Sequence, residues 1–298
     1  MAEDRTADVA PPPPSRDQGY QRSLEVHSHI EALYARVDQH AAYFRAMMPV
    51  DPSLPQPPGT TGGARLDPVV CALAIKAATT KRAILAVCEL GDGHNALALA
   101  RVLLEDACLL EWLIRGDGRR RLEAYVMFTS VQHERIVATF ERHSARFVSA
   151  GETLQMASNA DHRAIWTQVF KDRDRPTTSY RPTWEFDRDT GRGKAVTVHD
   201  IFKELADAPH SFEHDVLYGA LGSDIVHSGP FSLSRIMAMT NRKFVLRPMP
   251  VRDLCTIALA SSNTAMLLVL DSFTQFLGLD LSNEITSLKE EAKANPYV

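Results

Sequence analysis

The sequence predicts a mostly α-helical protein, a multi-helix bundle of long antiparallel helices with a small irregular or β-hairpin insertion near residues 177–198. Apolar side chains recur at helical spacing over several long segments. Short turns rich in glycine separate consecutive segments, as in antiparallel bundles. Hydrophobic residues make up 45% of the 298-residue chain, enough for a substantial buried core.

The N-terminal quarter divides into three parts ahead of the main domain. Residues 1–17 are polar and proline-rich, and we expect a disordered tail. Residues 18–48 carry apolar side chains at helical spacing, which predicts an N-terminal helix. Residues 49–66 form a Pro/Gly-rich linker that no regular helix would tolerate. Residues 67–298 are then predicted to form a single helical-bundle domain.

Three long helices are expected to open this domain. The first begins at Asp67, a capping residue followed by proline, and stops at Gly91. The second covers residues 94–115 and ends at Gly116-Asp117-Gly118. The third runs from residue 119 to about residue 150. The short connections favour antiparallel packing of neighbouring helices.

The second half of the chain is predicted to contain shorter elements. Residues 177–198 read as a surface flap, with a turn at Asp189-Thr190-Gly191 followed by the β-favouring Val196-Thr197-Val198. A short strand is expected at residues 243–246. The remaining helices are expected at residues 159–171, 199–206, 209–226, 230–239, 251–277 and 282–294.

Cysteine placement and hydropathy favour a cytoplasmic protein that does not span a membrane. Cys71, Cys88, Cys108 and Cys255 lie far apart in apolar segments, which indicates reduced core thiols. The N-terminus lacks the basic-then-apolar order of a signal peptide. Polar residues interrupt the longest apolar run, residues 254–270, so we expect a buried core helix there.

The charge balance argues against strong non-specific binding of nucleic acid. The chain has 33 basic and 37 acidic side chains and lacks a basic arm. A ligand or an RNA held in a local cleft stays compatible with this balance. Exposed apolar helix faces would favour a homodimer.

A short histidine motif carries the most recognisable chemistry in the sequence. His210 and His214 flank Glu213 in the pattern His-x-x-Glu-His, in which two histidines hold zinc and the glutamate acts as general base. On a helix, however, His210 and His214 share the apolar face, and His227 points roughly 120° away from them. We therefore expect packed histidines and no cofactor, with zinc binding as the alternative.

His227 is the histidine best placed for chemistry. It follows Asp224 near the end of its predicted helix, and the helix dipole and this carboxylate both favour the charged imidazole. Ser228-Gly229-Pro230 then turns the chain, so His227 lies at a corner. The alternative is a histidine that bonds the last carbonyl groups of the helix.

A polar stripe crosses the otherwise apolar helix at residues 94–115. Arg101 and Glu105 are four residues apart and can pair. Burying such charges without partners is costly, so the stripe either forms a structural ion pair or lines a ligand cleft. Its members are His94, Arg101, Glu105, Cys108, Trp112 and Arg115.

Two segments, Asn95–Trp112 and Tyr218–His227, carry a family resemblance. Through an R-x-x-x-E helix and a Y-x-x-x-x-S-x-x-x-H helix, the chain resembles the uncharacterised helical family called domain of unknown function 5677 over about Asp67–Leu277. The resemblance implies no settled activity. The matching positions are Arg101, Glu105, Tyr218, Ser223 and His227.

Such bundles are also similar to the HEPN superfamily, whose ribonucleases place an arginine shortly before a histidine on one helix. Ala220, Leu221 and Gly222 occupy those positions before His227, so the pattern is missing here. Arg101, on another helix, would have to take the place of that arginine.

Three functions follow as hypotheses. The first is a binding or regulatory module with a polar cleft lined by Arg101, Glu105 and His227. The second is a metal-independent ribonuclease in which His227 acts as general acid or base and Arg101 stabilises the developing phosphorane-like charge. The third is a zinc hydrolase that uses His210, Glu213 and His214. Further binding residues of the cleft would be Tyr218, Ser223, Asp224, Trp112 and Arg115.

Overall fold

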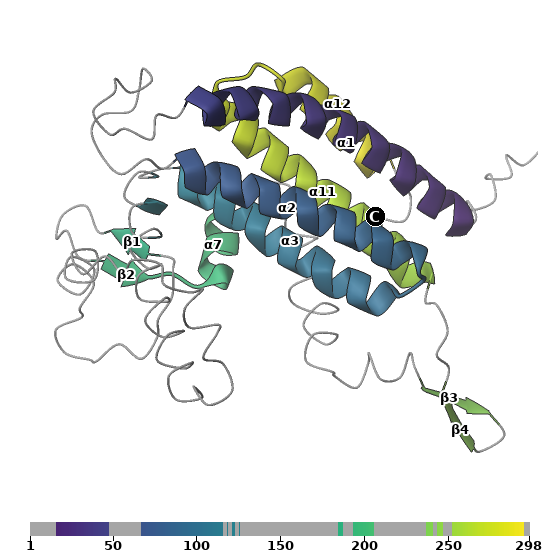
Figure 1. The fold of residues 1–298 in the computed structure, drawn as a ribbon. Coiled ribbons are helices and arrows are strands. Elements are labelled where there is room, and N and C mark those ends of the chain that lie inside the picture. The colour runs from purple at the N-terminus through teal and green to yellow at the C-terminus, as the bar shows by residue number, and fades with distance from the viewer. Residues whose placement is uncertain are drawn as a thin grey trace, which may run out of the picture.

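The structure, a computed structural model, describes part of the chain, and its helices form a bundle (Figure 1). The described residues are 16–47, 67–115, 118, 121–122, 125, 184–186, 193–205, 237–240, 243–246 and 252–294. Their helices are α1 (Arg16–Met47), α2 (Asp67–Glu89), α3 (Gly93–Ile114), α7 (Val198–Leu205), α11 (Arg252–Leu277) and α12 (Ser282–Lys293). The mostly α-helical bundle predicted from the sequence is confirmed.

Local signals set the ends of α2 and α3. Gly91 adopts a φ of 77° in the turn between them, a conformation that glycine reaches without strain. Asp92 caps α3 by accepting a hydrogen bond from the backbone N–H of Asn95 at 3.2 Å. The two helices are therefore joined by a tight turn and lie side by side, as the sequence predicted.

The central element of the bundle is α11, which packs against α1, α2, α3 and α12. Its side chains Met266 and Leu270 are fully buried, as are Leu103 and Leu104 on α3. Residues 253–277 are long and apolar enough to cross a membrane by length and composition, but 83% of the most apolar window is buried inside the bundle. This burial agrees with the predicted core helix.

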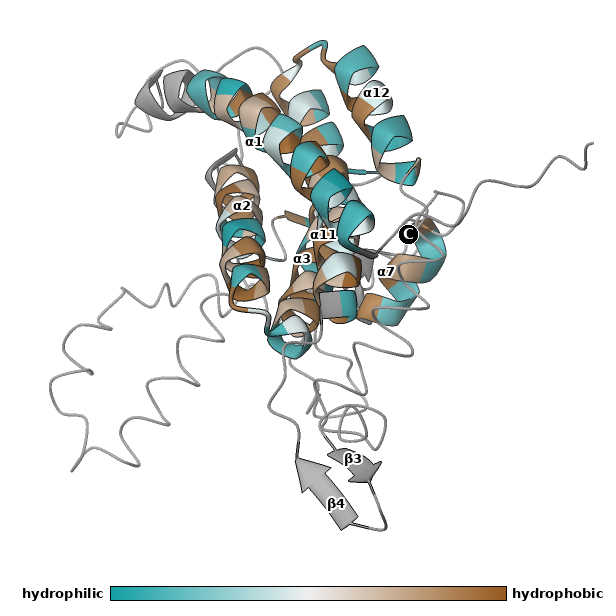
Figure 2. Ribbon diagram, turned by 90° about the vertical axis from the view of Figure 1, so that its right-hand side faces the viewer, coloured by the Kyte–Doolittle hydropathy of each residue, from teal (hydrophilic) through white to brown (hydrophobic). Residues whose placement is uncertain are grey.

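The outer helices α1 and α12 are the most hydrophilic of the bundle (Figure 2). Val26, Ile30 and Val37 form a buried stripe on α1, which packs against α11. Exposed ion pairs link α1 to α12, and Arg36 donates hydrogen bonds to both carboxylate oxygens of Glu284 at 2.6 and 3.0 Å. Such surface pairs stabilise little, so burial of the apolar stripe holds α1 in place.

Two antiparallel hairpins complete the described structure. Strand β1 (Trp184–Phe186) pairs with β2 (Gly193–Ala195), which confirms the β-hairpin predicted within residues 177–198. Strand β3 (Met237–Thr240) pairs with β4 (Lys243–Leu246), so the strand expected at residues 243–246 is also confirmed.

Two predictions about local structure were wrong. Val196-Thr197-Val198 does not form a strand, because Thr197 and Asp200 cap α7 reciprocally at 2.9 and 3.0 Å and Val198 begins that helix. Met237–Met239 lies in β3 and not in a helix over residues 230–239. Only two residues separate β3 from β4, the length of a tight hairpin, so pairing with β4 overrides local helix preference.

The four cysteines are buried thiols, as predicted. Arg121, Leu122 and Tyr125 are helical, which agrees with a helix starting near residue 119. The rest of that helix, the tail 1–15, the linker 49–66 and the helices expected at 159–171 and 209–226 lie outside the described residues.

Candidate functional site

Arg101 and Glu105 form the ion pair that their spacing predicted. The Nε of Arg101 donates to Oε1 of Glu105 at 3.0 Å along α3. The Arg101 side chain is 14% exposed and the Glu105 side chain is 32% exposed, while Cys108, one turn further on, is fully buried. The charged part of the stripe thus lies at the edge of the core, where a guanidinium and a carboxylate can still reach a polar ligand.

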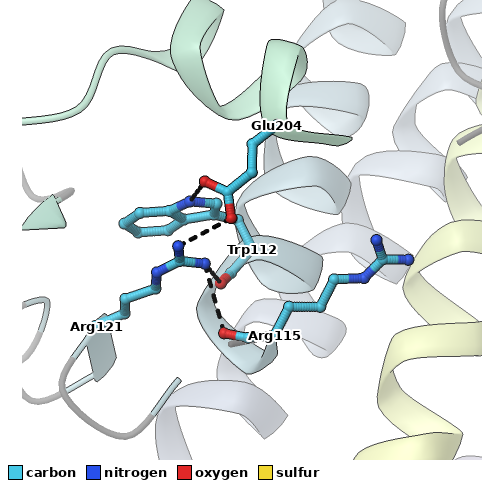
Figure 3. Close-up of polar contacts among 4 residues, drawn as sticks. All are labelled: Trp112, Arg115, Arg121 and Glu204. Atoms are coloured by element: carbon cyan, nitrogen blue, oxygen red, sulfur yellow. Dashed lines mark hydrogen bonds and ion pairs between the residues drawn. The ribbon is translucent and has the colours of Figure 1, made fainter. Parts of the chain in front are cut away.

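Trp112 belongs to a different group of polar contacts (Figure 3). This fully buried side chain donates from Nε1 to Oε2 of Glu204 on α7 at 2.9 Å. Arg121 donates to the other carboxylate oxygen of Glu204 at 2.9 Å and to the backbone carbonyl of Trp112 at 2.8 Å. The Arg121 guanidinium also stacks on the indole ring, 4.1 Å from its centroid.

This Trp112–Arg121–Glu204 cluster connects three segments that are distant in sequence. It joins the last turns of α3 to α7 and to the helical residue Arg121. The indole N–H, the buried guanidinium and the carboxylate all make hydrogen bonds within the cluster. The arrangement therefore anchors α7 against α3, and the structure separates Trp112 from solvent.

Arg115 caps the end of α3 and points away from the cluster (Figure 3). Its guanidinium pairs with Glu111 one turn earlier, and its side chain is about half exposed. A cation at the carboxyl end of a helix interacts favourably with the helix dipole. The predicted stripe is thus divided between an ion pair, a buried cluster and an exposed cap.

The remaining predicted site residues lie outside the described part of the chain. They are Tyr218, Ser223, Asp224 and His227 of the expected cleft, and His210, Glu213 and His214 of the expected zinc motif. Among the described residues, no group of three or more His, Cys, Asp or Glu side chains is arranged to hold a metal ion. The His227 cleft and the zinc site both stay predictions.

A fully buried lysine forms a polar group that sequence reasoning missed. Lys81 on α2 donates to Oγ of Ser262 at 2.8 Å and to Oδ1 of Asn263 at 2.5 Å, both on α11. Asn263 in turn donates to the backbone carbonyl of Ser23 on α1 at 2.9 Å. Burial lowers the pKa of Lys81 to about 7, although Cys88 and Glu31 oppose the shift.

His27 lies near this buried lysine on α1. Burial lowers its pKa to about 4, and the charge of Lys81 adds to the effect. The imidazole is therefore neutral near pH 7. The available sequence signal was the position of Lys81 at helical spacing from apolar residues of α2, together with polar residues in the middle of α11. Periodicity alone does not show that these groups meet.

These features define the protein as a helical bundle with an ion pair at the edge of its central helices and polar clusters inside it. Residues 67–244 match the model of DUF5677, a family of unknown function, and the chain belongs to that family. The match begins where we expected and ends before α11, whereas we expected it to reach Leu277. No curated protein and no solved structure matches the chain.

Proposed function

We propose that this protein is a binding or regulatory module whose ligand site is a polar cleft formed by Arg101, Glu105 and His227. The partly buried Arg101–Glu105 pair is the observation that carries the proposal. Removing charges from water costs free energy that the attraction between them repays only in part. A stability argument alone would favour apolar residues at this edge of the core.

The ion pair also suggests the chemistry of the ligand. Glu105 holds the Nε of Arg101, which orients the planar guanidinium at the edge of the core. A guanidinium in such a position recognises a carboxylate or a phosphate group. The proposed ligand is therefore an anion or a molecule that contains nucleotides, and RNA is one candidate. We place the protein in the cytoplasm.

The placement of His227 is tested by measuring its pKa by NMR. If Glu105 faces the imidazole, Glu105→Gln lowers the pKa of His227 by about 0.5 or more, because a nearby carboxylate stabilises the charged form. Glu284→Gln is the matched control, since Glu284 also pairs with an arginine but on the outer helices. An unchanged His227 pKa in Glu105→Gln would remove His227 from the cleft.

Ligand binding is tested by thermal unfolding with short RNAs and with orthophosphate. The proposal expects a rise in Tm for the wild type that is lost in Arg101→Gln and retained in Arg36→Gln, a change in an exposed ion pair. Equal stabilisation of all three proteins would contradict it.

The ribonuclease hypothesis is distinguished by incubating the same RNAs with wild type and with His227→Ala. Cleavage that disappears in the variant would replace binding with catalysis as the function of the cleft. Cleavage at equal rates would show that His227 takes no part in it.

A further inference from the structure

A cavity of about 610 Å³ opens at one end of the bundle. Its walls come from the first turns of α1, the end of α2 with the following turn at Gly91, and the start of α11. The volume lies within the roughly 300–1,000 Å³ typical of small-molecule pockets. Of the predicted site residues that the structure describes, Arg101, Glu105, Trp112 and Arg115, none lines this cavity.

Neutral and apolar groups form the interior of the cavity. Tyr20 and Leu24 contribute from α1, and the buried Cys88 and Cys255 contribute from α2 and α11. The Cys88 thiol donates to the backbone carbonyl of Cys255 at 3.6 Å. A hydrogen bond with Cys255 and burial raise the pKa of Cys88, and burial raises the pKa of Tyr20. These groups are therefore uncharged at neutral pH.

The charged residues among the described lining of the cavity are acidic. Asp17 and Glu89 line it from two different helices, and among the described residues no lysine, arginine or histidine does so. The amino end of α1 contributes a partial positive charge of about one half, which two carboxylates outweigh. Leu90 adds an apolar side chain that is 82% exposed.

We propose that this cavity binds a small amine with an apolar body. The ammonium group lies between the carboxylates of Asp17 and Glu89, and the apolar body fills the space against Tyr20, Leu24 and the two thiols. Coulomb attraction selects the sign of the ligand, and removal of apolar surface from water supplies most of the affinity. This site is independent of the Arg101–Glu105 cleft.

The test uses two probes with the same body and opposite charge, 4-phenylbutylamine and 4-phenylbutyrate, measured by calorimetric titration against the full chain. The proposal expects saturable binding of the amine and at least about tenfold weaker binding of the acid. Equal binding of both probes, or binding of neither, overturns it.

Substitutions at two exposed glutamates test whether the amine binds in this cavity. Glu89→Gln is expected to weaken amine binding by about fivefold or more, because it removes one carboxylate from the rim. Glu25→Gln on α1, whose carboxylate lies outside the cavity, should leave the affinity unchanged. Similar affinities for wild type and Glu89→Gln would show that the amine binds elsewhere, which also overturns the proposal.

The proposed amine site and the proposed anion site are tested separately. Arg101→Gln should retain amine binding, so failure of the anion site and failure of the amine site give different results. Loss of amine binding in Arg101→Gln would show that the two sites are not independent, which contradicts the proposal.

Discussion

Lys81 donates a hydrogen bond to Ser262 at 2.8 Å, although 181 residues separate them and the lysine side chain is fully buried. The contact joins α2 to the central helix α11 at a position where a purely apolar residue would also fill space. Burial beside neutral partners favours the uncharged amine of Lys81 over the charged ammonium, and this explains its lowered pKa.

The first prediction concerns the pH dependence that Lys81 imposes. Its pKa is about 7 in the folded protein and about 10.5 in the unfolded chain, so the unfolded chain binds more protons between these values. The free energy of unfolding should therefore rise with pH across that window, by about 2 kcal/mol from pH 7.5 to pH 9.5 relative to Lys81→Met. Urea unfolding of both proteins at several pH values measures the difference, and parallel pH profiles would contradict a buried titrating lysine.

The second prediction concerns His27 in the acid range. Its folded pKa of about 4 lies below the usual value of 6.5, so the unfolded chain binds more protons between pH 4 and pH 6.5. Stability should therefore fall as the pH drops through this window, and His27→Leu should lose less stability there than the wild type. His29→Leu, on the exposed side of α1, is the control and should behave like the wild type. Equal acid sensitivity of His27→Leu and the wild type would contradict the assignment.

The third prediction concerns the Trp112–Arg121–Glu204 cluster. Glu204→Ala removes the acceptor of the Trp112 indole N–H and of the Arg121 guanidinium, both of which are buried. A loss of about 1–3 kcal/mol in the free energy of unfolding is expected, because buried donors are left without their partner. Glu290→Ala, in an exposed pair with Lys293, should cost less than about 0.5 kcal/mol. Denaturant unfolding checks both, and equal small losses would argue against an anchoring role.

The fourth prediction concerns Gly278 at the end of α11. Its φ of 68° lies in the left-handed region, and a Cβ atom added there would meet no other atom within 4 Å. Gly278→Ala should therefore cost about 1 kcal/mol of stability through backbone strain alone. Thermal unfolding measures the change, and an unaltered Tm would show that the turn adjusts without strain.

Helix positions could be predicted from the sequence because their causes are local. Apolar periodicity and capping residues such as Asp92 act within one or two turns, and α2, α3, α11 and α12 fall within one or two residues of their predicted bounds. The Arg101–Glu105 pair was also predictable, because four residues along a helix bring two side chains together. Strand β3 was not, because its pairing with β4 outweighs a weak local preference.

By itself, the sequence determined the bundle class, most helix boundaries and the ion pair on α3. The tertiary structure alone decided which distant polar groups meet: Lys81 with Ser262, Trp112 with Glu204, and the carboxylates of Asp17 and Glu89 around one cavity. The physical reason is that helix formation depends on neighbours a few residues apart, whereas a buried polar contact depends on how two helices are placed and rotated against each other.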